Sequence, residues 1–178
     1  MTLFGIAGCT SLLLAGFTIK DTVTSLMPLQ YGETFTFDVM LVSDDNDQLL
    51  EYLNTNEVRA YINPMITNIK VINEDGREES VQLIVVSNEE SLRGYIQLLD
   101  RKGNRVSLTD GEVLSTINVA EVQGYDKGDT IILQNMDLIN AEVEVSEIVM
   151  NYLGNAIYMT ENTYEEYFDT FEANGAYV

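Results

Sequence analysis

Histidine and tryptophan are absent from this sequence of 178 residues, and cysteine occurs once, at Cys9. The chain therefore cannot build the usual zinc sites, a Ser-His or Cys-His nucleophile, or an internal disulfide. Neither a Walker A phosphate loop nor the glycine fingerprint of a dinucleotide-binding fold is present. The 29 acidic residues could form catalytic carboxylate pairs in so many ways that no pair is informative. We predict no enzyme, no catalytic residue, no metal site and no cofactor.

Basic residues are also scarce. Nine Lys and Arg stand against 29 Asp and Glu, which gives a formal net charge of -20. Such a surface repels the phosphates of nucleic acids and the headgroups of anionic lipids. We therefore expect no nucleic-acid partner and no adhesion to a membrane by charge alone. The acidic surface is expected to serve mainly solubility.

The N-terminal segment is a long apolar run. From Leu3 to Ile19 it contains no charged residue, and the first charge is Lys20. A run of this length and composition is close to one membrane span. Its glycines would also allow a second helix to approach closely. We predict a membrane helix that continues until Pro28 ends it, and we assign residues 1–26 to the end of a first transmembrane helix.

Other interpretations of this segment fit less well. A cleaved signal peptide needs basic residues before its apolar stretch, and Met1 and Thr2 supply none. Ile6–Cys9 resembles a lipoprotein cleavage box, but most of the apolar run lies after Cys9. A buried soluble helix of this length without charge would be unusual. The missing basic flank leads us to expect that the natural chain continues upstream and that this sequence starts inside the helix.

The rest of the chain reads as strands separated by polar turns. Tyr31–Val42 predicts a strand that buries one face, with Asp38 on the solvent side. Asn73–Gly76 predicts a tight hairpin turn, because Asp-Gly tolerates positive backbone dihedrals. Further turns are expected at Asp100–Gly103 and Tyr125–Asp129. The other predicted strands are Val58–Ile72 with a bend at Pro64, Glu79–Val86, Tyr95–Leu99, Arg105–Leu108, Glu112–Leu114, Thr130–Gln134, Ala141–Met150 and Ala156–Met159.

Short helices are predicted where a capping residue precedes an apolar pattern. Ser43–Asp47 predicts a turn and a helix N-cap; it also resembles part of a calcium loop, but it lacks the glycine and glutamate at EF-hand spacing. Ser87–Glu90 fits a capping box, and Thr116 and Thr160 are expected to cap two further helices. The last of these carries one aromatic stripe, expected to pack in the core: Tyr164, Tyr167, Phe168 and Phe171.

Strands interspersed with short helices indicate an α+β fold. We expect a strand-rich mixed domain with three or four short helices over residues 27–178, preceded by the stump of a membrane helix. No internal repeat or low-complexity tract divides this region further.

Several segments, taken in order, resemble FtsX-like, MacB-type ABC transporter permeases. Gly5–Val23 resembles the outer half of their first membrane helix, and Tyr31–Val42 resembles the first strand of their extracytoplasmic domain. Ser115–Leu133 resembles their strand–helix–turn element, and Val145–Phe168 resembles the strand, connection and Tyr-rich helix near the end of that domain. In the strand–helix–turn element, the matching positions are Thr116, Ala120, Gly128 and Asp129.

The resemblance implies a MacB periplasmic-core-like domain on the extracytoplasmic side of the cell membrane. Its partners would be the rest of the permease, a cytosolic ABC ATPase subunit and an external protein, peptide or lipid substrate. The domain would relay conformational change across the membrane, which requires Asp21–Met27 to continue the helix stiffly. The alternative is a signal- or lipid-anchored extracellular ligand-binding module without catalytic activity.

Overall fold

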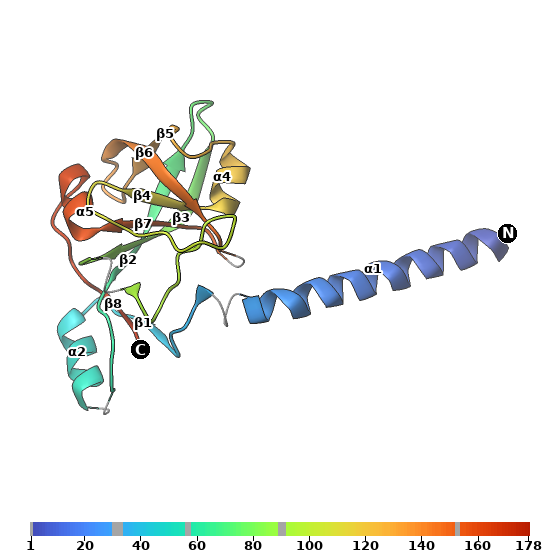
Figure 1. Ribbon diagram of the computed structural model, residues 1–178, viewed down its shortest axis with the longest axis horizontal. Coiled ribbons are helices and arrows are strands. Elements are labelled where there is room, and N and C mark those ends of the chain that lie inside the picture. Colours follow the sequence, from blue (N-terminus) through green and yellow to red (C-terminus); the bar gives the residue numbers. More distant parts are fainter. Residues whose placement is uncertain (1, 30–33, 56–57, 89–91, 152–153) are drawn as a thin grey trace.

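A computed structural model describes residues 2–29, 34–55, 58–88, 92–151 and 154–178 of the chain. A long N-terminal helix, α1, is followed by a compact body of strands and short helices (Figure 1). The elements of this body are β1 (Met40–Val42), α2 (Asn46–Thr55), β2 (Met65–Ile72), β3 (Glu78–Val86), β4 (Val113–Thr116), α4 (Ile117–Gln123), β5 (Thr130–Gln134), β6 (Asn140–Val149), β7 (Ala156–Thr160), α5 (Glu161–Tyr167) and β8 (Gly175–Tyr177).

Helix α1 spans Thr2–Leu29 and projects away from the body, with the N-terminus at its far end (Figure 1). It is continuous through Asp21–Met27, as the relay hypothesis requires. The sequence predicted that Pro28 would end the helix. Instead, α1 includes Pro28 and ends one residue later, at Leu29. Proline here lies in the last turn, where it breaks little of the hydrogen-bond ladder above it.

The body is built on a closed barrel with the strand order β2-β3-β7-β4-β6-β5. Antiparallel hairpins join β2 to β3 and β5 to β6, and antiparallel pairing of β2 with β5 closes the barrel. Two pairs are parallel, β3 with β7 and β4 with β6. The barrel therefore depends on strand pairs whose members are far apart in sequence. Its strands and the short helices between them confirm the predicted α+β fold.

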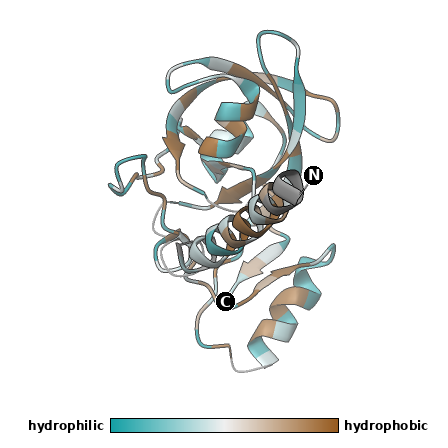
Figure 2. Cartoon of the chain, turned by 90° about the vertical axis from the view of Figure 1, so that its right-hand side faces the viewer, coloured by the Kyte–Doolittle hydropathy of each residue, from teal (hydrophilic) through white to brown (hydrophobic). Residues whose placement is uncertain are grey.

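Alternation along the strands fills the barrel. In β6, the exposed residues alternate with buried Ala141, Val143 and Val145. These side chains join one large cluster with the inward residues of the other strands, among them Val71, Leu83, Leu133 and Ile157. The four aromatic residues predicted on the last helix pack against this cluster, with Tyr164 buried and Tyr167, Phe168 and Phe171 partly buried. The helix is shorter than predicted: α5 ends at Tyr167, so Phe168 and Phe171 lie in the chain after it. Figure 2 shows apolar residues along the strands and alternating apolar and polar residues on α2.

A second apolar layer lies on the outer side of β3, β4 and β7. Ile84, Leu114 and Tyr158 are buried there under residues 92–108, which connect β3 to β4 with little regular structure. The expected strands Tyr95–Leu99 and Arg105–Leu108 are present only as single bridges, such as Leu99 with Arg105. The turn between them is as predicted: Gly103 N donates to Asp100 O at 3.0 Å.

The predicted strand Tyr31–Val42 is largely wrong. Only Met40–Val42 is a strand, while Phe35 makes a single bridge to Ile96, and residues 30–33 lie outside the described part. The alternation reflects a segment that lies along the body and inserts Phe35 and Phe37 into its outer layer. Val39 is 47% exposed, contrary to expectation, whereas Asp38 is exposed as predicted.

A small unit stands below the barrel in Figure 1, formed by α2 and the two-stranded sheet of β1 and β8. The predicted cap is confirmed: Asp45 Oδ1 accepts from Gln48 N at 3.0 Å, and Leu49 and Leu53 are buried against Ala176 of β8. Strand β8 was not predicted. The predicted capping box Ser87–Glu90 lies partly outside the described residues, since 89–91 are not described.

Candidate functional site

No group of three or more His, Cys, Asp or Glu side chains that could hold a metal ion occurs among the described residues. The acidic segment Ser43–Asp47 borders an open depression, but the Asp45 carboxylate is already used. It accepts from the backbone and the side chain of Gln48, the latter at 2.8 Å. This geometry is that of a helix cap.

The four matching positions of the strand–helix–turn element, at 116, 120, 128 and 129, make hydrogen bonds or core contacts within the barrel. Thr116 precedes α4 and was predicted to cap it, but its hydroxyl makes no cap hydrogen bond. The hydroxyl instead accepts from Ala156 N of the neighbouring strand β7 at 3.1 Å. Ala120 is buried in the barrel core. Gly128, at φ 88°, donates to Val145 O at 2.8 Å, and Val145 N donates to Asp129 O at 2.9 Å. The hydrogen bonds of Gly128 and Asp129 fix the turn to β6.

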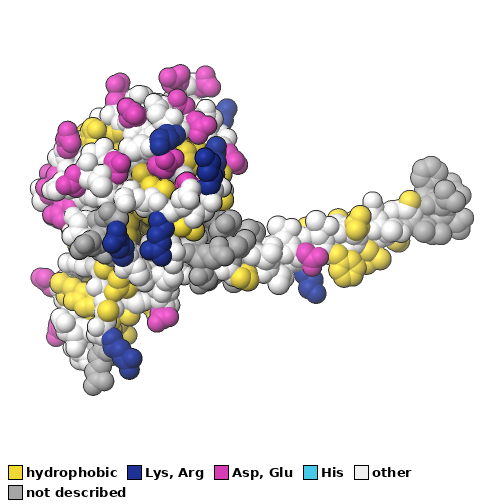
Figure 3. All heavy atoms as spheres, viewed as in Figure 1, with side chains coloured by type: hydrophobic (Ala, Val, Ile, Leu, Met, Phe, Trp, Pro, Cys, Tyr) yellow, Lys and Arg dark blue, Asp and Glu magenta, His cyan; other side chains and the backbone are white. Residues whose placement is uncertain are grey.

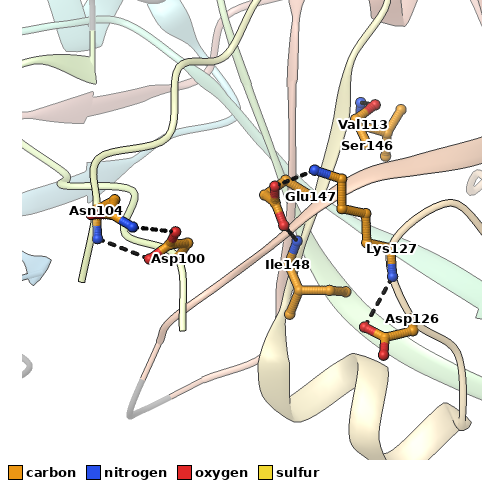
Figure 4. Close-up of polar contacts among 8 residues, drawn as sticks. All are labelled: Asp100, Asn104, Val113, Asp126, Lys127, Ser146, Glu147 and Ile148. Atoms are coloured by element: carbon orange, nitrogen blue, oxygen red, sulfur yellow. Dashed lines mark hydrogen bonds and ion pairs between the residues drawn. The ribbon is translucent and has the colours of Figure 1, made fainter. Parts of the chain in front are cut away.

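The same turn carries an ion pair that is visible in Figure 4. Lys127 Nζ donates to Glu147 Oε2 at 2.5 Å, across from the Asp100–Asn104 turn. The hydrogen bond and the charge of Glu147 raise the pKa of Lys127. Because the pair is exposed, it contributes little to stability. It joins the turn before β5 to strand β6.

The junction between α1 and the barrel is the best-defined candidate for a functional site. The chain leaves α1 at Leu29 and is bound to the body from Thr34 onward. Thr36 N donates to Tyr95 O at 2.8 Å, and Gln97 N donates to Thr34 O at 2.7 Å. Further along, Asp38 N donates to Val178 O at 2.7 Å and Val178 N to Val39 O at 2.9 Å. The segment after the helix is thus held between the 92–108 connection and the end of the chain.

Aromatic side chains fill the same junction. Phe35 lies 5.1 Å from Phe37, which stacks on Tyr177 with ring centroids 4.6 Å apart. Burial raises the pKa values of Tyr177 and Tyr158, so both phenols stay neutral in the physiological range. These rings line a depression of about 300 Å³, which is mostly apolar, together with Met40. The rings therefore pack the segment after α1 against the body.

Helix α1 exposes apolar side chains along the part whose side chains are described. Leu12 is 76% exposed and Phe17 61%. Hydroxyls on this helix bond back to its own carbonyls: Thr18 Oγ1 donates to Leu14 O, and Thr22 Oγ1 to Thr18 O, both at 2.9 Å. Among the residues that the structure describes, no helix combines the length and the apolar character needed to cross a membrane.

A second exposed apolar feature is the tip of the β5–β6 hairpin. Met136 is 74% exposed and Leu138 73%. Asn135 holds the tip, because its Oδ1 accepts from Asp137 N and Ile139 N. Leu138 has φ 64°, a conformation rare for a branched side chain. The turn is therefore fixed in a strained form that presents two apolar side chains.

Comparisons with known proteins place the fold but not the family. No protein-family model matches the chain, and no curated protein matches it. The fold is similar to that of the extracellular domain of an ABC-type transporter. The chain is similar to the crystal structure of the extracellular domain of the noncanonic ABC-type transporter YknZ from Gram-positive bacteria. That match has a TM-score of 0.50 at 11% identity and covers 78% of this chain and 81% of the other.

The periplasmic region of MacB from Actinobacillus actinomycetemcomitans is also similar, with a TM-score of 0.46 at 10% identity, covering 77% of this chain and 71% of that one. The likeness to the YknZ domain confirms the predicted resemblance at the level of fold.

Proposed function

We propose that this chain is the extracytoplasmic domain of an ABC transporter permease, held at the membrane by α1. The fold of the YknZ extracellular domain supports this assignment. The apolar run Leu3–Ile19 and the exposed apolar surface of α1 support membrane insertion, because such a helix in water would leave large side chains uncovered. Hydroxyls that bond back to the helix, as at Thr18 and Thr22, satisfy polar groups that lipid cannot.

The domain would act as a mechanical relay. The observation that carries this proposal is the junction: α1 is continuous to Leu29, and the chain is hydrogen-bonded to the body from Thr34. A motion of the helix would therefore move the body rather than be absorbed by a long tether. The ATPase would be a separate cytosolic subunit, and the other partners would be the rest of the permease and an external protein, peptide or lipid. We expect the domain itself to catalyse nothing.

Spin-label distances test the relay. Cys9 is exposed and is the single cysteine, so it takes one nitroxide, and Glu142→Cys on the exposed face of β6 takes the second. In lipid nanodiscs, a rigid junction gives a narrow distance distribution. A variant with a Gly-Ser segment inserted after Leu29 gives a broad distribution and serves as the control. A parent distribution as broad as that of the insertion variant rules out a stiff relay.

Mass spectrometry of the mature native protein distinguishes the permease proposal from the alternative, a lipid- or signal-anchored external module. A diacylglycerol adduct on Cys9, or cleavage within residues 15–25, would support the anchored module. An intact α1 that floats with liposomes after carbonate extraction supports the membrane helix.

A further inference from the structure

Among the described residues of the body, the most exposed large apolar side chains lie at the tip of the β5–β6 hairpin. Met136 is 74% exposed and Leu138 73%, nearly as much as Leu12 of α1 at 76%. The next in the body is Tyr52, at 57%. We call Met136, Leu138 and Ile139, which is 44% exposed, the apolar tip. A partner that covers these side chains releases the water around them, so the tip is a candidate docking surface.

Hydrogen bonds within the hairpin hold the apolar tip in one conformation. Asn135 N donates to Ile139 O, and Leu138 N donates to Asn135 O, both at 3.1 Å. At the end of the strands, Gln134 Nε2 donates to Asn140 Oδ1 at 2.8 Å. A partner therefore meets a preformed surface, which lowers the entropic cost of binding.

An open groove lies beside the apolar tip. Strand β5 pairs with β2 as far as Gln134 opposite Lys70, so the hairpin continues toward the start of β2. There Met65 and Thr67 line a groove of about 820 Å³. No Lys or Arg is among its lining residues. We call it the acidic groove, because it is lined by the carboxylates of Asp44, Asp45, Asp47 and Glu172.

The phenol of Tyr164 on α5 independently places the tip near the groove. Burial raises the pKa of Tyr164, and the charges of Asp169, Asp137 and Glu172 raise it further. Asp137 lies between the two exposed residues of the apolar tip, and Glu172 lines the acidic groove. Both carboxylates are therefore close enough to act on the same phenol, so the tip and the groove belong to one surface.

The charge of this surface has one sign. Residues 128–178 contain ten Asp and Glu and no Lys or Arg. All nine basic residues of the chain belong to its described part, and Lys70, which lies on β2, is paired with Glu78 at 2.9 Å. Figure 3 shows acidic side chains and no basic ones at the edge of the body farthest from α1, which is where α5 lies in Figure 1.

These charges select among partners. An anionic lipid surface is repelled by carboxylates, and α5 lies on the side of the body turned away from α1 (Figure 1). A second copy of the chain would bring the same carboxylates and another net charge of -20 against this surface. A basic protein segment is attracted instead, and apolar residues between its charges can cover the tip.

We propose that the apolar tip and the acidic groove together dock a basic segment of an extracytoplasmic partner protein. The Lys or Arg side chains of this segment lie in the groove, and its apolar side chains cover Met136 and Leu138. That the partner is extracytoplasmic rests on the proposed function; the docking surface itself does not. Docking on the side opposite α1 places the partner where a motion relayed through the body would reach it.

Peptides of matched length test the docking chemistry on the full chain in neutral detergent micelles. The probe is the end-blocked hexapeptide KKLLKK, titrated by calorimetry at low salt and at 0.5 M salt. Its controls are KKSSKK, which keeps the charge, and EELLEE, which keeps the leucines. We expect KKLLKK to bind and to weaken with salt, KKSSKK to bind roughly tenfold more weakly, and EELLEE not to bind. In a sample with ¹³C-methyl methionine, KKLLKK should shift the signal of Met136.

Variants of the apolar tip test the site itself. Leu138→Asn removes one apolar side chain, and asparagine tolerates the positive φ at this position. It should weaken binding of KKLLKK roughly tenfold. The control Val122→Asn removes an apolar side chain that is 52% exposed on α4, and it should bind like the parent. Circular dichroism establishes that each variant folds.

Charge-matched variants separate the groove from the overall charge of the chain. Asp137→Asn/Glu172→Gln removes two charges from the docking surface, and Glu74→Gln/Asp75→Asn removes two from the turn between β2 and β3. Both leave the same net charge. The first should weaken binding of KKLLKK several-fold, whereas the second should leave it close to that of the parent.

Each remaining outcome overturns a defined part. Equal losses in the surface variants and their controls, or an unshifted Met136 signal in the parent, overturn the docking surface. Equal affinity for KKLLKK and KKSSKK overturns the role of the apolar tip. A Met136 signal that shifts with the concentration of the chain alone assigns the surface to a second copy and overturns the partner. A chain that binds KKLLKK but does not float with liposomes keeps the docking surface and overturns only the membrane anchor.

Discussion

The ring of Phe37 stacks on the ring of Tyr177, with centroids 4.6 Å apart and an interplanar angle of 27°. Phe37 belongs to the segment that follows α1, whereas Tyr177 lies in β8 at the other end of the chain. Tyr177 is almost completely buried and also bridges Ile62, just before β2. The stack therefore connects the segment that follows α1 to the small sheet of β1 and β8 and, through Ile62, to the start of β2 in the barrel.

Replacing Phe37 by alanine should weaken this joint. Phe37 is partly buried, so the loss of burial and of ring contacts should cost about 1–3 kcal/mol of unfolding free energy. Urea unfolding of the full chain in micelles measures it. Val39→Ala, at a site 47% exposed, is the control and should change stability by less than about 0.5 kcal/mol. In the spin-label experiment, Phe37→Ala should also broaden the distance distribution.

Thr160 stabilises the start of α5 through its hydroxyl. Its Oγ1 accepts from Thr163 N and donates to Asp110 Oδ1 at 2.6 Å, while being almost completely buried. Thr160→Val keeps the shape but removes these bonds, and should destabilise the domain by about 1–2 kcal/mol. Thr160→Ser retains the hydroxyl and should recover most of the loss. Equal unfolding midpoints for the two variants would show that the cap contributes nothing.

Acid should destabilise the domain through two loop carboxylates. Hydrogen bonds from Asn104 lower the pKa of Asp100, and those from Thr160 and Asn162 lower the pKa of Asp110. Each group has a lower pKa in the folded than in the unfolded chain, so its contribution is present above the ordinary value of 3.8 and is lost as pH falls below it. The urea midpoint should therefore decrease as the pH is lowered from about 5 to about 3.

Two charge-neutralising substitutions test this pH dependence, one at a turn carboxylate and one at a control position. Asp100→Asn should flatten the decline, because the titrating group is gone. Glu142→Gln, on the exposed face of β6, removes a charge without disturbing a turn. If both variants decline as steeply as the parent, the turn carboxylates do not set the acid limit.

Local patterns in the sequence predicted much of the barrel. The alternation in Ala141–Met150 and the Asp-Gly turn after Ile72 identified β6 and the β2–β3 hairpin, because both signals depend on neighbouring residues. Closure of the barrel was not predictable in this way. It depends on β3 with β7 and β4 with β6, parallel pairs whose members are distant in sequence.

The candidate site was harder to predict than the strands. Phe35 and Phe37 alternate as in a strand, yet their partners Ile96 and Tyr177 lie in an irregular connection and a three-residue strand.

Leu138 offers a test of stored strain. Its φ of 64° costs a leucine about 1–2 kcal/mol relative to an ordinary backbone conformation, while asparagine tolerates this region. Because the side chain is 73% exposed, little packing is lost on substitution. Leu138→Asn should raise the unfolding free energy by about 0.5–1 kcal/mol, as measured by urea unfolding. Met136→Asn, at a neighbouring position 74% exposed and without positive φ, should leave it unchanged within error. A loss of stability in Leu138→Asn would mean that the leucine makes contacts which outweigh its strain.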